Sequence, residues 1–570
     1  MNDTEFVHVA SLDDLAREGR RLLAAGGQAI AVFYEGGEVH AVDNRCPHMG
    51  FPLDEGTVDE GILTCHWHHA RFDLSCGDTF DPWADDVPTY PVAVRDGDVY
   101  VRPEEEREDP PRVHWRKRLR TGLEENLRLV IAKSVVGLDD AGVDYVEPFG
   151  QALTFGTEFR EAGWSSGLTI HTAMANVLDD LADDDRRRAL YQGIVEVAGD
   201  CAGEPPRFDQ PAFDTRDPSR ERLKSWFRET VEVRDRDGAE RCLRTAIEAF
   251  DEATVANLLF AAATDHRYLD GGHTLDFLNK AFESLDHVGW DRADRVLPSL
   301  VSSLTDAERA EETAEWRQPV DLAALLDDAF EELPERASGD GWTEPDDLLE
   351  TLLGDDPEAI ADALLDAVDA GATPRDLAGV VRDAAATRVV RFSTGNEFGD
   401  WNTVHHTFTY ANAVYFATRR TDAWELHRGV FDAAMNVYLD RFLNTPPAPM
   451  PDGDASVDSE AALRGLLETF ETEGEVNAAG ERVADFLAAG GDPARLRERL
   501  GHALVREDVG FHVFQNVEAA FRGSRTAGER SDRYLIGTAR YLAAHTPTRR
   551  ERDQTFRIAD RLHRGEKIHE

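Results

Sequence analysis

The sequence predicts a multidomain protein in which a small all-β domain is followed by a large all-α domain. Hydrophobic residues alternate with a period of two over about the first 100 residues, as in half-buried strands. A charged, proline-containing stretch follows, and beyond it hydrophobic residues recur with the helical period of about 3.6. The predicted boundaries are 1–103 for the β domain, 104–112 for the linker and 113–570 for the helical domain, with a candidate internal boundary at 444–457.

Short hydrophobic runs between turn residues define the β domain. Ser11 is the expected N-cap of a short helix after the first strand. A closing hairpin at 92–101 turns at Asp96-Gly97, a dipeptide that favours a tight two-residue turn. The other expected strands lie at 6–10, 28–34, 39–43, within 56–63 and at 71–74.

The helical period continues from residue 113 to the end of the chain. Leu322, Leu325, Leu326 and Ala329 form one apolar stripe of the kind that marks a buried helix face. No strict sequence period indicates a known repeat. The expected helices lie at 120–137, 168–198, 218–232, 238–263, 272–284, 290–303, 321–333, 356–370, 374–388, 401–418, 421–444, 458–471, 475–489, 510–523 and 531–562.

An acidic excess dominates the composition. The chain has 111 Asp and Glu against 62 Lys and Arg, a formal net charge of -49, and only five lysines. The excess is spread along the chain, which is typical of a halophile-type protein, because the Debye length falls to about 3 Å at 1 M salt and self-repulsion is screened. So much negative charge argues against nucleic acid and anionic membranes as partners.

Cysteine usage and hydropathy predict a cytoplasmic protein. Five cysteines in 570 residues are too few for a disulfide scaffold. Residues 1–5 lack the hydrophobic segment of a signal peptide, and no apolar run approaches the roughly 18 residues of a membrane-spanning helix. We therefore expect no membrane partner.

The most specific motif is a pair of segments, at 46–50 and 65–69, that each combine a cysteine with a histidine. Two thiolates and two imidazoles are the ligand set of a Rieske [2Fe–2S] cluster, in which the cysteines hold one iron and the histidines the other. A proline and a glycine in the first segment favour a tight turn whose N–H groups point at sulfur. The predicted cofactor-binding and metal ligands are Cys46, His48, Cys65 and His68.

Zinc is the alternative occupant of these four residues. Zinc sites with two cysteines and two histidines usually pair like with like, whereas each segment here mixes the two types. His66 and His69 are expected near the cluster or exposed, and not as ligands. The run from His69 to Leu74 resembles the one that follows the second ligand loop in Rieske ferredoxins and in the Rieske domains of oxygenases.

The resemblance favours the ferredoxin-like subclass. Rieske proteins of quinol-oxidising respiratory complexes carry an extra cysteine in each ligand loop, joined as a disulfide, and a serine after the second ligands. Here neither segment has a second cysteine, Cys76 lies eight residues beyond His68, and Ala70 stands near the serine position. Fewer hydrogen bonds to sulfur imply a reduction potential near the low end of the Rieske range.

Histidine clusters in the helical domain are candidates for a second redox centre. Ring-hydroxylating oxygenases hold iron with a motif that begins Asp-x-x-His-x₄₋₅-His, and the closest match, from Asp265 to His273, has the wrong spacing. Helical di-iron proteins use Glu-x-x-His on two helices, and no clean copy occurs in these clusters. The clusters are Glu158 with His171; Asp265, His266, His273 and Asp276; His405, His406, Tyr410 and Asn412; and His502 with His512.

The stretch 398–412 and the earlier Ile170-His171-Thr172 are similar to questin oxidase-like proteins. That family is helical, and its members act as Baeyer–Villiger-type oxygenases on aromatic polyketides. The resemblance implies a pocket lined by catalytic candidates, which are His171, His266, His273, His405 and His406.

The sequence thus predicts an iron–sulfur redox protein, and the interpretation favours an enzyme of the oxidoreductase class other than a conventional ring-hydroxylating α subunit. The cluster would pass single electrons to or from an oxidoreductase centre in the helical domain, of oxygenase type with a further iron and a small-molecule substrate. The alternative is an electron-transfer ferredoxin whose helical domain docks partners or senses. No flavin or nicotinamide fingerprint such as G-x-G-x-x-G follows a strand, so an external reductase or ferredoxin is the expected electron donor.

Overall fold

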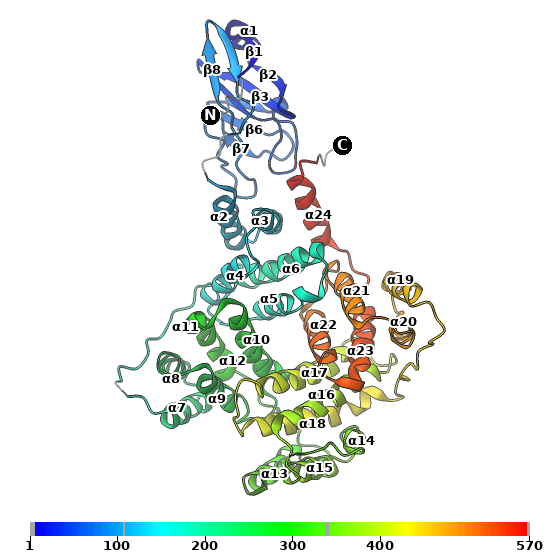
Figure 1. The fold of residues 1–570 in the computed structure, drawn as a ribbon. Coiled ribbons are helices and arrows are strands. Elements are labelled where there is room, and N and C mark those ends of the chain that lie inside the picture. Colours follow the sequence, from blue (N-terminus) through cyan, green and yellow to red (C-terminus); the bar gives the residue numbers. More distant parts are fainter. Residues whose placement is uncertain (1–5, 106–108, 216, 337–340, 567–570) are drawn as a thin grey trace. The chain divides into compact units, whose positions relative to one another are not determined.

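The computed structural model describes residues 6–105, 109–215, 217–336 and 341–566. A small β region is followed by a large helical region, which confirms the predicted fold class (Figure 1). By contacts the chain divides into two compact units, residues 1–151 with 551–570 and residues 152–550. Residues 106–108 of the predicted linker and residues 1–5 lie outside the described residues.

The strands of the first unit form small antiparallel sheets. The β8–β9 hairpin turns at Asp96 and Gly97, which both have positive φ, as the sequence predicts. The sequence did not predict β2, whose residues alternate between half-buried and exposed. The described sheets are β1 (Val7–Ser11), β9 (Asp98–Val101) and β8 (Val92–Arg95); β2 (Arg20–Ala25), β3 (Gln28–Glu35) and β4 (Glu38–Asp43); and β5 (Thr57–Asp59), β6 (Ile62–Thr64) and β7 (Arg71–Asp73).

Helix α1 (Leu12–Glu18) follows β1 and begins where Ser11 was expected to cap it. The Ser11 hydroxyl accepts the N–H of Asp14 at 3.1 Å, and the helix ends at Gly19 with φ 78°. The chain then builds two hydrophobic cores. One of them contains Phe33, Leu63 and Phe72 and also buries the two motif cysteines, Cys46 and Cys65. Burial of these thiols places the predicted ligand loops directly on the core.

Three helices complete the first unit: α2 (Pro111–Glu124), α3 (Arg128–Asp140) and α24 (Glu551–His563). Helices α2 and α3 approach closely at Gly122, which lies against the backbone of Ile131. Arg45, next to the first motif cysteine, donates from Nη1 to the Leu562 carbonyl at the end of α24, at 3.0 Å. Segments far apart in the sequence therefore support the first ligand loop.

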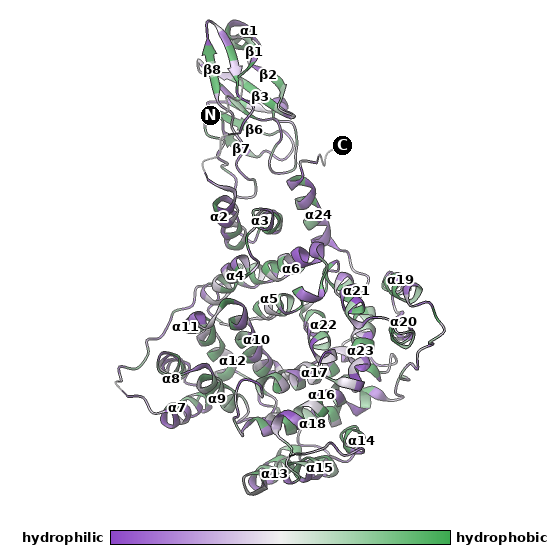
Figure 2. Ribbon diagram, viewed as in Figure 1, coloured by the Kyte–Doolittle hydropathy of each residue, from purple (hydrophilic) through white to green (hydrophobic). Residues whose placement is uncertain are grey.

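The second unit is helical in its described part. Buried residues run along α9 from Val255 to Ala263 with one interruption. Hydrophobic residues also colour much of the helical ribbon green (Figure 2). Its helices are the C-terminal part of α4 (Val146–Glu158), α5 (Ser166–Asn176), α6 (Asp183–Cys201), α7 (Arg220–Glu232), α8 (Arg236–Ala249), α9 (Glu252–Ala263), α10 (His273–Val288), α11 (Ala293–Val296), α12 (Val301–Thr305), α13 (Leu322–Arg336), α14 (Leu348–Leu352), α15 (Pro357–Asp369), α16 (Pro374–Val390), α17 (Asp400–Ala417), α18 (Leu426–Leu439), α19 (Ser459–Thr469), α20 (Val476–Ala488), α21 (Pro493–Val505), α22 (Phe511–Ser524) and α23 (Ser531–Ala544).

Most predicted helices are present, but some boundaries differ. The predicted helices at 120–137, 168–198, 238–263, 290–303 and 531–562 each span two separate α-helices, and α4, α14 and α21 were not predicted. The last split falls at the proline of Thr546-Pro547, which lacks the N–H that a continuing helix needs.

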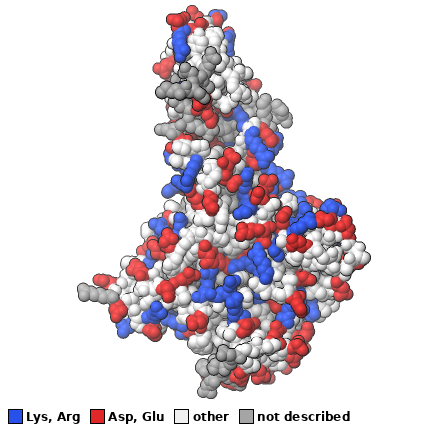
Figure 3. Space-filling model, viewed as in Figure 1, with Lys and Arg blue, Asp and Glu red and all other residues white. Residues whose placement is uncertain are grey.

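Charged groups occur both inside and outside the helical unit. Inside, the Lys280 ammonium lies 2.9 Å from Glu283 and 2.7 Å from Glu518, and all three side chains are almost completely buried. Arg522 pairs with the same two glutamates. Outside, acidic side chains are spread over the face in view and are interspersed with basic ones (Figure 3). Among the described helices, none is both long and apolar enough to cross a membrane.

Candidate metal centres

The two motif loops of the first unit fold back through the same pair of backbone hydrogen bonds. The Cys46 N–H donates to the carbonyl five residues on at 2.8 Å, and its own carbonyl accepts the N–H four residues on at 2.7 Å. Cys65 makes the equivalent bonds at 2.8 and 3.0 Å. The fourth residue is Gly50 in the first loop and His69 in the second, with φ of 85° and 64°. The sequence indicated the turn at Gly50, whereas the matching role of His69 was missed because a histidine rarely adopts positive φ.

The two cysteine side chains lie side by side with backbone donors aimed at them. Each is at most 2% exposed, and the N–H groups two and three residues on point at each sulfur. The hydrogen bond from the Cys46 thiol, together with these N–H groups, lowers the pKa of Cys65 to about 6. The same interaction and burial raise the pKa of Cys46. Neighbouring sulfurs surrounded by N–H donors suit thiolates that share one iron.

The two imidazoles of the motif also meet. The rings of His48 and His68 lie 4.8 Å apart between centroids, and the ring of Trp83 packs 4.6 Å from that of His48. Burial, with help from Lys133 and His68, lowers the pKa of His48 to about 4, so its ring is neutral at pH 7. Its Nδ1 is buried and has no hydrogen-bond partner among the described residues. A neutral ring with an unused nitrogen is what an iron ligand requires, so this donor set fits a Rieske cluster.

A second group of imidazoles lies in the helical unit. His273 at the start of α10, His406 on α17 and His512 on α22 each offer a ring nitrogen, and these nitrogens all lie within 4.8 Å of one another. The Nε2 atoms of His406 and His512 are 2.9 Å apart. Each side chain is half-buried, and within the described residues no carboxylate belongs to the group. We call these three residues the histidine centre.

Burial keeps the histidine centre neutral. It lowers the pKa of His406 to about 3, with further lowering by His273 and His512, and it lowers the pKa of His512 to about 4. The pKa of His273 is also lowered by burial. The aromatic rings of Phe277 and Phe511 flank His273 at 5.7 and 5.5 Å. Neutral imidazoles in an aromatic surrounding present lone pairs without the cost of removing a proton.

A strained turn positions His273. Tyr268 and Asp270 have positive φ, of 43° and 55°, and Gly271 and Gly272 follow with 63° and 92°. A Cβ at Gly272 would approach the side chain of Tyr268 to 2.8 Å, so only glycine allows this close packing. Left-handed non-glycine residues are uncommon and cluster where a site must be held in one geometry.

His405 lies beside the histidine centre. Its ring is fully buried, lies 5.1 Å from that of His512 between centroids, and faces the Asn516 amide through Nδ1 at 3.3 Å. Its Nε2 has no hydrogen-bond partner among the described residues. Burial holds its pKa well below the usual value. His405 therefore adds a fourth neutral imidazole next to the three.

A carboxylic acid lies one helical turn beyond the centre. Asp276, three residues after His273, is buried and accepts the side-chain amide of Gln515, three residues after His512. Burial raises the pKa of Asp276 to about 7. The second turns of α10 and α22 are therefore tied together beside the histidines.

The remaining catalytic candidates lie elsewhere. His266 bonds to Glu311 at 2.6 Å and to Glu232 at 2.5 Å, which gives it ionic partners instead of a metal. His171 is buried on α5, where the backbone of Gly193 approaches its ring. The structure thus brings together His273, His406 and, beside them, His405, and it adds His512, which the sequence placed only in a loose pair with His502.

Comparisons with known proteins match the first unit. A family model for the Rieske [2Fe-2S] domain matches residues 5–91. The 3-phenylpropionate/cinnamic acid dioxygenase ferredoxin subunit of Photorhabdus laumondii is 40% identical over 79 residues, which are 14% of this chain and 75% of that protein. Human apoptosis-inducing factor 3 is 35% identical over 95 residues, and this chain spans only 16% of its length.

Solved ferredoxins give similar matches. The ferredoxin of carbazole 1,9a-dioxygenase from Nocardioides aromaticivorans is 30% identical, with a TM-score of 0.17, over 17% of this chain and 98% of that one. The Sphingomonas yanoikuyae B1 ferredoxin is 26% identical, with a TM-score of 0.17, over 18% of this chain and all of that one.

Proposed function

Because the chain belongs to the Rieske [2Fe–2S] domain family through residues 5–91, we propose that it is an oxidoreductase whose cluster delivers single electrons to a metal ion at the histidine centre. In this proposal Cys46 and Cys65 hold one iron of the cluster, and His48 and His68 hold the other. When bound, such a cluster accepts and releases one electron at a time. The electron donor is an external reductase or ferredoxin.

The observation that carries the proposal is the convergence of neutral imidazoles from three helices. Two imidazole Nε2 atoms 2.9 Å apart either share one proton or direct their lone pairs at one cation, and the nearby nitrogen of His273 favours the cation. Histidine nitrogens suit zinc, copper, iron and nickel alike. Because zinc has no redox chemistry, a centre supplied with single electrons requires a redox-active ion, and we propose iron.

Three protein donors leave coordination positions open for a small-molecule substrate, as in catalytic metal sites. His405 and the strained turn before His273 hold the imidazoles in place. The relatives support the electron-delivery role, since they are named as ferredoxin subunits of a dioxygenase. Here the proposed cluster and the histidine centre are parts of one chain. Such a link raises the effective concentration of the cluster at the histidine centre.

The test is metal analysis of the full chain after anaerobic reconstitution with iron and sulfide. We expect three irons per chain, of which two belong to the cluster. The H406A/H512A double variant should lose the third iron and keep the EPR signal of the reduced cluster. The matched control is H502A, because His502 is a helical, partly buried histidine that instead pairs with Asp185 at 2.9 Å; it should keep all three irons.

Two irons in the wild-type chain would overturn the histidine centre as a metal site. The alternative would then stand, in which the chain is an electron carrier and the helical unit docks partners or senses. Loss of the cluster signal in H406A/H512A would mean that the substitutions act on folding, and single H406A and H512A variants would then decide by their iron content.

A further inference from the structure

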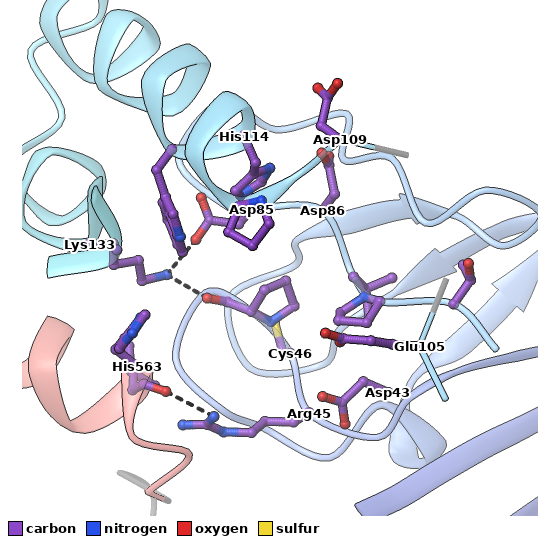
Figure 4. Close-up of a pocket in the computed structure, with 18 of the residues that line it drawn as sticks. Asp43, Arg45, Cys46, Asp85, Asp86, Glu105, Asp109, His114, Lys133 and His563 are labelled. Carbon is purple, nitrogen blue, oxygen red and sulfur yellow. Dashed lines mark hydrogen bonds and ion pairs between the residues drawn. The ribbon is translucent and has the colours of Figure 1, made fainter. Parts of the chain in front are cut away.

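Lys133 lies on α3, outside the strands that carry the ligand loops, yet its ammonium group bonds directly to the first loop. Nζ donates to the Pro47 carbonyl at 2.5 Å, a bond drawn as a dashed line from Lys133 in Figure 4. It also donates to the His48 carbonyl at 3.3 Å. The residue is only 4% exposed. A buried cation thus contacts two consecutive backbone carbonyls of the first loop, and one of them belongs to the predicted ligand His48.

The counter-ion of Lys133 is Asp85, which is shared with a second cation. The Asp85 carboxylate lies 3.0 Å from Lys133 Nζ and 2.7 Å from Arg118 Nε, and it is 6% exposed. Burial alone would raise the pKa of Asp85, but the two cations lower it to about 2, so it is ionised at pH 7. Arg118 also donates to the carbonyls of Pro82 and Ala84, at 2.7 and 3.0 Å. Two cations and one anion leave a net buried charge of one positive unit beside the first loop.

The net positive charge of Lys133, Asp85 and Arg118 should act on the cluster because it is buried beside the first loop. Reduction adds one negative charge to the cluster, and a nearby positive charge favours the reduced form. The attraction is stronger in a buried region than at the surface, because water screens it less. Groups that contact the ligands from outside tune metal sites in this way.

We propose that Lys133 is a positioning residue that raises the reduction potential of the cluster by holding a buried positive charge against the loop of Cys46 and His48. The helices after the linker are then part of the redox site and do more than carry it. This inference rests on the cluster alone and does not depend on a metal at the histidine centre.

The experiment is an EPR-monitored redox titration of the full-length holoprotein at fixed pH. In K133M the ratio of oxidised to reduced cluster at a given applied potential should rise at least tenfold. This corresponds to a reduction potential lower by about 59 mV for a one-electron couple. D85N leaves both cations without their anion and should shift the potential upward by a similar factor. In K133M/D85N the two changes of charge cancel. The ratio of oxidised to reduced cluster at a given applied potential should therefore return to within about threefold of the wild-type ratio.

The matched control is K117M, because Lys117 lies on α2 and is 69% exposed at its side chain. It should leave the potential unchanged. The shift of K133M should persist when the salt concentration is raised to 3 M, since a buried charge is screened far less than an exposed one.

A K133M protein with a loaded cluster and the wild-type potential would overturn the proposal. A K133M/D85N protein whose reduction potential is as low as that of K133M would also overturn it, because the change of charge would then not be the cause of the lowered potential. If K133M fails to hold a cluster, D85N decides: a raised potential supports the proposal, and an unchanged or lowered one overturns it. A missing third iron would not alter these outcomes, because the readout is the signal of the cluster.

Discussion

Replacing Gly122 by alanine should separate the two helices that carry Arg118 and Lys133. A Cβ at Gly122 would lie 2.8 Å from Ile131 Cγ1, 3.2 Å from the Ile131 backbone nitrogen and 3.5 Å from its Cα. Because two of these atoms are backbone, α3 itself must move. Overpacking of this kind costs typically 1–3 kcal/mol, against a gain of about 1 kcal/mol from the better helix propensity of alanine. We expect a net loss of up to about 2 kcal/mol.

The assay is urea unfolding followed by the visible circular dichroism of the cluster, which reports the first unit alone. With urea slopes of about 1–3 kcal/mol per molar, a loss of about 2 kcal/mol corresponds to a midpoint lower by roughly 0.7–2 M. The matched control is G199A on α6, where a Cβ would meet nothing within 4 Å; it should leave this midpoint unchanged and stabilise the helical unit by up to about 1 kcal/mol. A G122A midpoint equal to or above that of wild type would refute the close-packing argument.

Other substitutions test the buried charges of the helical unit. K280M should cost about 3–5 kcal/mol in urea unfolding followed by far-UV circular dichroism, because two buried glutamates would share one arginine; an unchanged midpoint would contradict the buried network. Burial opposes protonation of His266, but its two glutamates raise its pKa above 6.5. The contribution of these ion pairs to stability is therefore present below pH 6.5 and is lost as the pH rises through the folded pKa. H266Q should lose more stability at pH 6 than at pH 9, and an equal loss at both would argue against the ion pairs. Burial raises the pKa of Asp440 to about 8, so the folded state holds a proton that the unfolded state has released above pH 4. Relative to wild type, the free energy of unfolding of D440N should rise by up to about 1.4 kcal/mol per pH unit between pH 5 and 8 and level off above. A difference in unfolding free energy that does not change with pH would show that this carboxyl titrates normally.

The sequence carried its predictions furthest where the chemistry is local; of these, the hairpin is confirmed and the set of cluster ligands stays a prediction. The ligand pattern from Cys46 to His68 depends on residues within each loop, and the hairpin at Asp96-Gly97 depends on one dipeptide that favours positive φ. Local signals also located most helices. They failed where one apolar pattern runs through a turn, as between α5 and α6, because the periodicity of two adjoining helices can continue across a short break.

Tertiary contacts account for what the sequence did not show. His273, His406 and His512 lie on three helices, and no spacing rule connects residues so far apart in the chain. Lys133 was one of five lysines without a motif, and its contact with the Pro47 carbonyl arises from packing of α3 on the first loop. Conversely, His266 looked like a ligand by its neighbours in sequence, and only the fold reveals its glutamate partners.

In the proposed electron path, the two candidate centres differ in a way that would favour electron flow from the cluster toward the histidine centre. The thiolates would bring negative charge to the proposed cluster and so lower its potential, a tendency that Lys133 would partly offset under our proposal. The histidine centre has only neutral donors, so an iron bound there would keep its full positive charge in a half-buried site, which favours its reduced state. A carboxylate ligand would remove this advantage. Asp276, three residues after His273, has a pKa raised to about 7 by burial and accepts a hydrogen bond from Gln515. Under our proposal, the absence of a carboxylate among the described residues of the centre is therefore a reason why the cluster would act as the electron donor of the histidine centre.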